Sequence, residues 1–154
     1  MDIRFMNEAL RQAKKAFAIG ETPIGAVIVK DGKIISRAYN KRETKKNALL
    51  HAEITAIDKA CKKLGGWRLC GCDIYVTLEP CPMCAGAIVQ ARIDNVYFGA
   101  YDEKAGSFGS VCDVSHLLPH KVNAVGGIME DETKAVLKQF FEKLRKREFK
   151  NANE

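Results

Sequence analysis

The sequence of 154 residues lacks several features that mark whole classes of protein. No apolar run approaches the roughly 20 residues that a membrane-spanning helix needs, and residues 1–8 hold no apolar stretch typical of a secretory signal. Prolines number four and glycines twelve, too few for a collagen-like or disordered chain. We therefore expect a cytoplasmic globular protein that makes no contact with a membrane.

The length favours a single domain, which we expect over residues 1–154. Hydrophobic residues make up 47% and charged residues 29% of the chain, as is usual for a folded domain. A chain of this size can bury a core without a disulfide or a metal to stabilise it. A bound metal ion would therefore serve chemistry.

Positive charge is in moderate excess, because 25 lysines and arginines outnumber 19 aspartates and glutamates and give a net charge of +6. Many proteins without a polyanionic partner have such a surface, yet the excess also permits attraction to a nucleic acid. Basic residues gather near the end of the sequence, at Lys143, Arg145, Lys146, Arg147 and Lys150.

Hydrophobic periodicity predicts alternating helices and strands, which is typical of an α/β fold. Asp31-Gly32 joins two β-branched runs and predicts a hairpin, so the sheet should be mixed. A long loop should follow the fourth strand, over residues 100–113. We expect helices over 2–19, 51–64, 81–92, 114–118 and 130–149, and strands over 25–30, 33–39, 73–78, 95–99 and 121–126.

Six cysteines are present, and a reducing compartment would leave them as free or metal-bound thiols. Cys61 falls on the apolar stripe of a predicted helix and should lie in the core. Cys81-Pro82-Met83-Cys84 is a C-x-x-C motif at a predicted helix start, where the helix N-terminus favours thiolates. Two thiolates on one helix face could hold one zinc ion.

His51 opens another predicted helix and is the candidate third ligand. One histidine and two cysteines leave the fourth tetrahedral position for water, which is the arrangement of a catalytic zinc site. A closed structural site would need a further ligand, for which Cys70, Cys72 and Cys112 are the candidates. We expect these three to be ordinary buried or loop thiols.

Glu53 follows His51 by two positions, and Pro80 precedes the two cysteines. The combination H-x-E…P-C-x-x-C is the signature of the zinc nucleobase deaminases. In that chemistry a glutamate moves protons without binding the metal. Glu53 is therefore the predicted general acid and base, and the predicted metal ligands are His51, Cys81 and Cys84.

The segments around these motifs resemble the bacterial tRNA-specific adenosine deaminases, a family of the cytidine deaminase-like superfamily. The resemblance implies a three-layer α/β/α fold with a mixed five-stranded sheet. It also implies a homodimer with one Zn²⁺ per subunit, and hydrolytic conversion of adenosine to inosine at the wobble position of a tRNA anticodon stem-loop. The similar segments are residues 23–27, 38–40, 51–53, 75–87, 96–100, 109–110 and 140–141.

The same resemblance implies three polar contacts with the substrate. Asn40 would contact the base or the ribose, and Asp102 would contact the substrate backbone or a 2′-hydroxyl. The backbone amide near Ala52 would orient the purine. The alternatives are ordinary ones, because asparagine often forms turns and aspartate is common in solvated loops.

Three further residues complete the predicted substrate site. Pro23 and Leu78 would help to wall the pocket, although packing in the core explains both equally well. Arg145 would meet RNA phosphates, because basic side chains near the end of the last helix can contact a nucleic-acid backbone. An ordinary solvated helix face is the alternative for Arg145.

Two other functions fit parts of the pattern. A zinc deaminase of a free base or nucleoside, of the guanine or cytosine type, would use the same metal ligands and glutamate. A non-enzymatic RNA-binding or zinc-stabilised module would have no need of Glu53. The positive charge and the family-like segments argue against the first alternative, and the presence of Glu53 argues against the second.

Overall fold

The computed structural model describes the backbone of residues 1–152 and the side-chain surroundings of residues 1–147. The strands form one five-stranded sheet in the order β2-β1-β3-β4-β5. Strand β1 is antiparallel to β2 and β3, whereas β3, β4 and β5 are parallel. The elements are α1 (Ile3–Ala18), β1 (Gly25–Lys30), β2 (Lys33–Tyr39), α2 (Ala52–Leu64), β3 (Cys72–Leu78), α3 (Pro82–Gln90), β4 (Asn95–Ala100), β5 (Asn123–Val125) and α4 (Glu130–Ala152).

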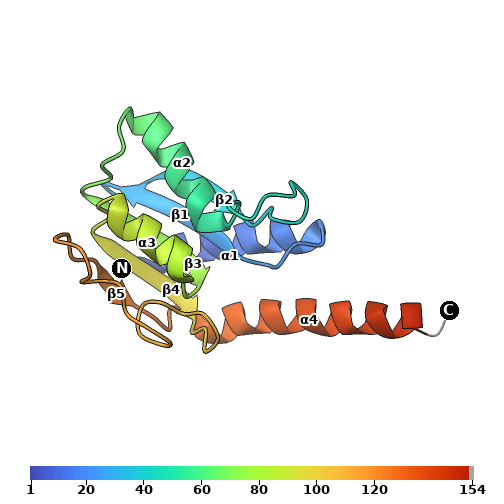
Figure 1. Cartoon of the computed structure of the whole chain (residues 1–154). Helices are drawn as coiled ribbons and strands as arrows, with labels where there is room; N and C mark the ends of the chain where they lie inside the picture. Colours follow the sequence, from blue (N-terminus) through green and yellow to red (C-terminus); the bar gives the residue numbers. More distant parts are fainter. Residues whose placement is uncertain (153–154) are drawn as a thin grey trace.

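Helices cover both faces of the sheet, which confirms the three-layer α/β/α fold. Helices α2 and α3 lie on one face, and α1 lies on the other (Figure 1). Alternate residues of β1 pack against the two helical layers, because successive side chains of a strand point to opposite faces of the sheet. Ala26 and Ile28 belong to the cluster beneath α2 and α3, and Val27 and Val29 to the cluster beneath α1.

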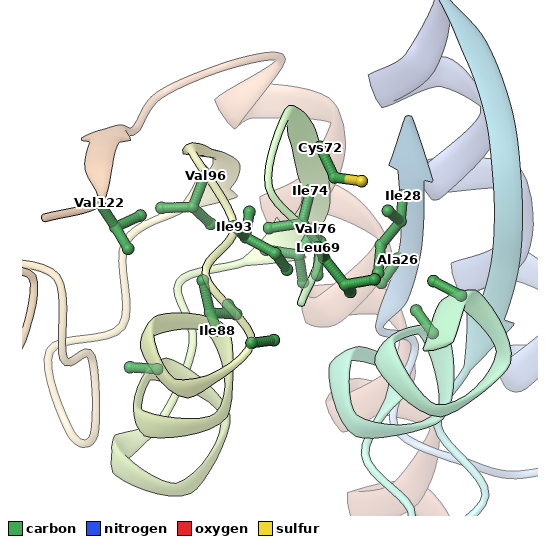
Figure 2. Packing of buried hydrophobic residues seen from close by; sticks show 14 of the residues in the cluster. Ala26, Ile28, Leu69, Cys72, Ile74, Val76, Ile88, Ile93, Val96 and Val122 are labelled. Carbon is green, nitrogen blue, oxygen red and sulfur yellow. The ribbon is translucent and has the colours of Figure 1, made fainter. Parts of the chain in front are cut away.

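The larger cluster joins the strands to α3. Figure 2 shows Ile74 and Val76 of β3 and Val96 of β4 on the side of the sheet that carries Ile88 of α3. All four side chains are completely buried. This packing fixes the position of α3, whose first turn carries the predicted cysteine ligands.

Two glycines make specific contacts possible. The predicted hairpin is confirmed, because Asp31 and Gly32 both have positive φ, 50° and 71°, as a two-residue type I′ turn requires. At Gly25 a Cβ atom would lie 2.0 Å from the carbonyl oxygen of Ala9. Helix α1 can therefore approach β1 so closely only because residue 25 is glycine.

The prediction of a short helix over residues 114–118 is wrong. Turns and bends occupy this segment. The Asp113 carboxylate accepts a hydrogen bond from the Ser115 backbone N–H at 2.9 Å, and the Ser115 carbonyl accepts one from Val122 at 3.1 Å. A helix would bond the Ser115 carbonyl to the backbone N–H of residue 119, but that residue is Pro119, which has no N–H, and the carbonyl accepts from Val122 instead.

Helix α4 begins against the sheet and then extends past it (Figure 1). Phe140 is buried against Phe17 of α1, with 5.8 Å between the ring centroids. Residues 141–147 are all exposed, so the predicted apolar face of this helix is covered only as far as Phe140. The tail after Lys150 lies largely outside the described side chains. No helix in the described part of the chain is both long and apolar enough to cross a membrane.

Candidate active site

The three predicted metal ligands meet at the starts of two neighbouring helices. His51 is the N-cap residue of α2, Cys81 is the N-cap residue of α3, and Cys84 lies in the first turn of α3. The Nδ1 atom of His51 is 3.7 Å from Sγ of Cys81 and 3.5 Å from Sγ of Cys84. The three possible ligand atoms all lie within 4.8 Å of one another.

Both N-cap side chains are free of the usual capping role. An N-cap side chain normally accepts a hydrogen bond from the first turn of its helix. Neither His51 nor Cys81 does so. Pro82 in the first turn of α3 starts that helix without a capping bond, because its φ angle is already helical. Both side chains are thus available as ligands.

The two thiols differ in their affinity for protons. A hydrogen bond from Cys84, followed by one from His51, lowers the pKa of Cys81 to about 4. The hydrogen bond to Cys81, together with burial, raises the pKa of Cys84. The hydrogen bond with Cys81 also raises the pKa of His51. One thiolate, one thiol and one imidazole form a soft donor set that fits zinc.

Glu53 lies beside this cluster with its side chain 4% exposed. Burial raises the pKa of its carboxyl group, and a hydrogen bond from the Cys84 thiol partly offsets that effect. Its Oε1 atom is buried without a hydrogen-bond partner in the described part of the chain. An unpaired buried carboxylate oxygen is costly, so its retention points to a group that acts on a ligand or on water.

The other cysteines do not join the cluster. Within the described residues, the three-ligand group contains only His51, Cys81 and Cys84. Cys72 is a buried core residue, and Cys61 is partly buried against the same core. Exposed positions are occupied by Cys70 and Cys112. The structure therefore brings no fourth cysteine ligand to the site.

Asn40 and Ala52 lie close to the cluster along the chain. A backbone hydrogen bond from Lys41 to Leu50, at 3.0 Å, returns the loop after β2 to the residue preceding His51. Asn40 is 5% exposed, and its side chain accepts a bond from the Arg42 backbone N–H at 3.3 Å. This is the turn-forming role that the sequence offered as the alternative. Ala52 is completely buried.

Leu78 and Asp102 line one groove of about 800 Å³, together with residues that the sequence did not single out. The groove runs between the end of β3, the loop after β4, and α4. Pro23 is buried, and Arg145 is exposed on the extending part of α4. Neither of these two residues lines the groove. Its other lining residues are Thr22, Tyr101, Glu103, Lys104, Ser110, Glu130, Lys134, Leu137 and Phe141.

Sequence reasoning also missed Glu79, which is 2% exposed. The one available signal was its position between the end of β3 and the C-x-x-C motif. A charged residue there would ordinarily be assigned to a solvated loop.

Comparison with known proteins places the chain in a family. The model of the MafB19-like deaminase family matches residues 2–145. The tRNA-specific adenosine deaminase of Bacillus subtilis (strain 168) is 49% identical over 148 residues, which cover 95% of this chain and 92% of that protein. The tRNA-specific adenosine deaminase of Aquifex aeolicus (strain VF5) is 47% identical, covering 92% of this chain and 94% of that protein.

Solved structures agree with this placement. A structure from studies of A-to-I editing by tRNA:A34 deaminases at the wobble position of transfer RNA has a TM-score of 0.82 and 42% identity, covering 88% of this chain and 100% of that one. A guanine deaminase from Bacillus subtilis is 45% identical with a TM-score of 0.63, covering 66% of each chain.

The chain therefore belongs to the deaminases, the class that its fold and its histidine-cysteine-cysteine cluster also define. Identities of 49% and 47% over more than nine-tenths of the chain place it further, within the tRNA-specific adenosine deaminase family. This confirms the family resemblance that the sequence motifs predicted.

Proposed function

We propose that this protein hydrolyses adenosine to inosine at the wobble position of a tRNA anticodon, with residues 1–154 acting as one zinc-dependent deaminase domain. The observation that carries the proposal is the Glu53 carboxylate, which is buried beside the cluster of His51, Cys81 and Cys84 and whose Oε1 atom has no hydrogen-bond partner within the described residues. A structural metal site would not need that glutamate. The names of the most similar relatives supply the substrate class.

His51, Cys81 and Cys84 would hold one Zn²⁺ per subunit. Zinc bound there would lower the pKa of water toward neutrality and so supply a nucleophile at the site. The low pKa of Cys81, about 4, means that this ligand is already a thiolate at neutral pH. Cys84 must lose its proton when the metal binds, because its pKa is raised.

Glu53 would move the protons of the reaction. Its carboxylate accepts a proton from the attacking water and delivers it to the adjacent ring nitrogen of adenine. The carboxylate then takes the second proton from the hydroxyl on the ring carbon and passes it to the amino group. That group leaves as ammonia, and the water oxygen stays on the ring carbon as the carbonyl. Burial raises the Glu53 pKa, which brings the proton affinity of this carboxylate closer to neutral pH and suits it to carry a proton both ways.

The remaining predicted residues would hold the RNA. Proteins read RNA mostly through unstacked bases in loops, and an anticodon loop provides such bases. We propose that the Ala52 backbone and Asn40 contact the target nucleoside, and that Pro23 and Leu78 wall its pocket. Asp102, in the groove beside Leu78, would contact the RNA backbone or a 2′-hydroxyl. Arg145 would meet phosphates, in keeping with the net charge of +6.

The assembly and location follow from the same proposal. The family resemblance implies a homodimer, and a tRNA substrate implies work in the cytoplasm. Light scattering of the zinc-loaded protein would measure the mass in solution directly. A mass of one chain at micromolar concentration would contradict the homodimer and leave the chemistry of the site unaffected.

One experiment tests the substrate. Zinc-loaded protein would be incubated with an anticodon stem-loop that has adenosine at the wobble position, and separately with free adenosine, cytidine and guanine. Inosine in the RNA, with the free compounds unchanged, is the expected result. Turnover of guanine with the RNA untouched would instead support the second candidate, which the 45% identity to a guanine deaminase favours.

A further inference from the structure

A buried carboxylate joins the metal site to the loop after β4. Glu79 follows Leu78, the last residue of β3, and precedes Cys81 by two positions. Its side chain is 2% exposed, and no lysine, arginine or histidine within residues 1–147 forms an ion pair with it. Hydrogen bonds alone therefore compensate for the burial of this carboxylate.

Among residues 1–147, every hydrogen bond to that carboxylate comes from one loop. Oε1 accepts from the backbone N–H groups of Phe108, at 3.2 Å, and Ser110, at 3.1 Å. Oε2 accepts from the backbone N–H of Asp102, at 3.0 Å, and from the Ser110 hydroxyl. Both oxygens are thus satisfied by residues 102–110. The loop also has bonds of its own, such as the one from the Gly106 backbone N–H to the Asp102 carbonyl at 2.8 Å, and the Glu79 carboxylate ties this folded loop to the end of β3.

The fit between loop and carboxylate is tight. A Cβ atom at Gly106 would lie 2.3 Å from Oε2 of Glu79 and 2.5 Å from the carbonyl oxygen of Asp102. The Ser107 backbone N–H donates to the carbonyl of Pro80 at 2.9 Å, on the segment that leads into Cys81. The loop is therefore bound on one side to Glu79 and on the other to the residue next to a metal ligand.

Two residues that Glu79 holds, Asp102 and Ser110, line the groove beside Leu78. We propose that Glu79 is a positioning residue, which sets the place of this groove-lining loop relative to the start of α3 where Cys81 and Cys84 lie. Glu79 does not touch the substrate itself. It acts through Asp102 and its neighbours, and this role rests on the proposed function, in which the groove receives RNA.

The variant Glu79→Gln tests this role, because its amide would present N–H groups to the N–H donors that now bind the carboxylate. Gly106→Ala is a second variant, which displaces the loop without removing the charge. Asn95→Ala is the matched control. It removes a hydrogen bond to Asp73, of 2.7 Å, at the opposite end of the same pair of parallel strands.

We expect both test variants to keep stoichiometric zinc and to raise KM for the wobble-adenosine stem-loop by about tenfold or more, with kcat changed less than about threefold. Asn95→Ala should lower the melting temperature while leaving KM unchanged. Amide hydrogen exchange at Phe108 and Ser110 should accelerate in Glu79→Gln, which weakens the acceptor of these two N–H groups, and should stay unchanged in Asn95→Ala.

The outcomes separate cleanly. Wild-type KM in folded, zinc-loaded Glu79→Gln and Gly106→Ala would overturn the positioning role and leave the proposed function standing. Loss of zinc from Glu79→Gln would also overturn it, because the residue would then serve the metal site alone. A wild-type protein that leaves the stem-loop unmodified would overturn the proposed function itself, and the role of the loop with it.

Discussion

The floor and the rim of the site are built in different ways. The floor consists of His51, Glu53, Cys81 and Cys84, which lie at the starts of two helices packed on a buried sheet. We use the word rim for the segments that carry or follow the proposed RNA contacts, namely the loops over residues 41–50 and 101–110 and the extending part of α4, where most side chains are exposed. In the proposed function, helix starts packed on the sheet would hold the reacting groups, whereas connecting segments would recognise the RNA.

The two rim loops also differ from each other. Each is held by a buried glutamate, but Glu79 is fully hydrogen-bonded, whereas Glu21 accepts one bond from the Thr44 backbone N–H. Glu21 is 1% exposed, and its Oε2 atom has no partner within the described residues. Glu79 thus makes more hydrogen bonds to the loop over residues 101–110 than Glu21 makes to the loop over 41–50.

Removal of the proposed zinc ion should have the largest effect on activity, because His51, Cys81 and Cys84 would then no longer hold the group that activates water. A chelator should abolish inosine formation, and added zinc should restore it. Zinc uptake near neutral pH should release protons from Cys84 and His51, because both bind the metal deprotonated and both have raised pKa values, whereas Cys81 with its pKa of about 4 has already lost its own. Calorimetry in buffers of different ionisation enthalpy would count the protons. Full activity in metal-free protein would contradict the assignment of the floor.

Glu53→Gln should have the next largest effect. The amide keeps the shape of the side chain but cannot carry a proton, so kcat should fall by about 10²- to 10⁴-fold. Zinc content, measured by atomic absorption, should stay at one per chain. Glu142→Gln, the same change on the exposed face of α4, should leave kcat unchanged. Wild-type kcat in Glu53→Gln would contradict the role of Glu53 as the general acid and base.

A smaller effect is expected on the free energy of unfolding, which should differ between variants of the two glutamates that bind the rim loops. Glu79→Gln should lower the free energy of unfolding by about 3 kcal/mol, because it disrupts several hydrogen bonds to a buried charge. Glu21→Gln should change it by less than about 1 kcal/mol, since its amide oxygen can still accept from Thr44. Urea unfolding of the zinc-loaded proteins measures both. Equal losses would show that the loops are held equally firmly.

Arg145→Ala should have the smallest effect, on RNA binding alone. Loss of one phosphate contact should weaken binding severalfold and make the slope of log affinity against log salt shallower by about 1. Lys33→Ala is the control, because it removes the same charge at the hairpin turn, at the other end of the sheet. Identical salt slopes for both variants would place Arg145 outside the RNA interface.

The contrast between floor and rim also explains what the sequence could predict. Cys81 and Cys84 were predictable because a spacing of three residues at a helix start places two ligands side by side, and His51 because it completes the H-x-E…P-C-x-x-C signature. The groove beside Leu78 was not, because its walls come from segments that only tertiary packing brings together. The burial of Glu79 and the exposure of Phe141 depend on the same packing. The helix expected over residues 114–118 is absent because Pro119 has no N–H for the Ser115 carbonyl, which accepts a bond from Val122 instead.

Helices α2 and α3 both begin without a capping hydrogen bond to the side chain of the N-cap residue, which matters for folding. His51 and Cys81 are 30 residues apart in the chain, and neither caps its own helix. An ion shared between them would close that loop as a cross-link does, which restricts the unfolded chain and ties the two helix starts together. Metal supply would then govern how much of the folded protein a cell retains, in addition to how fast that protein works.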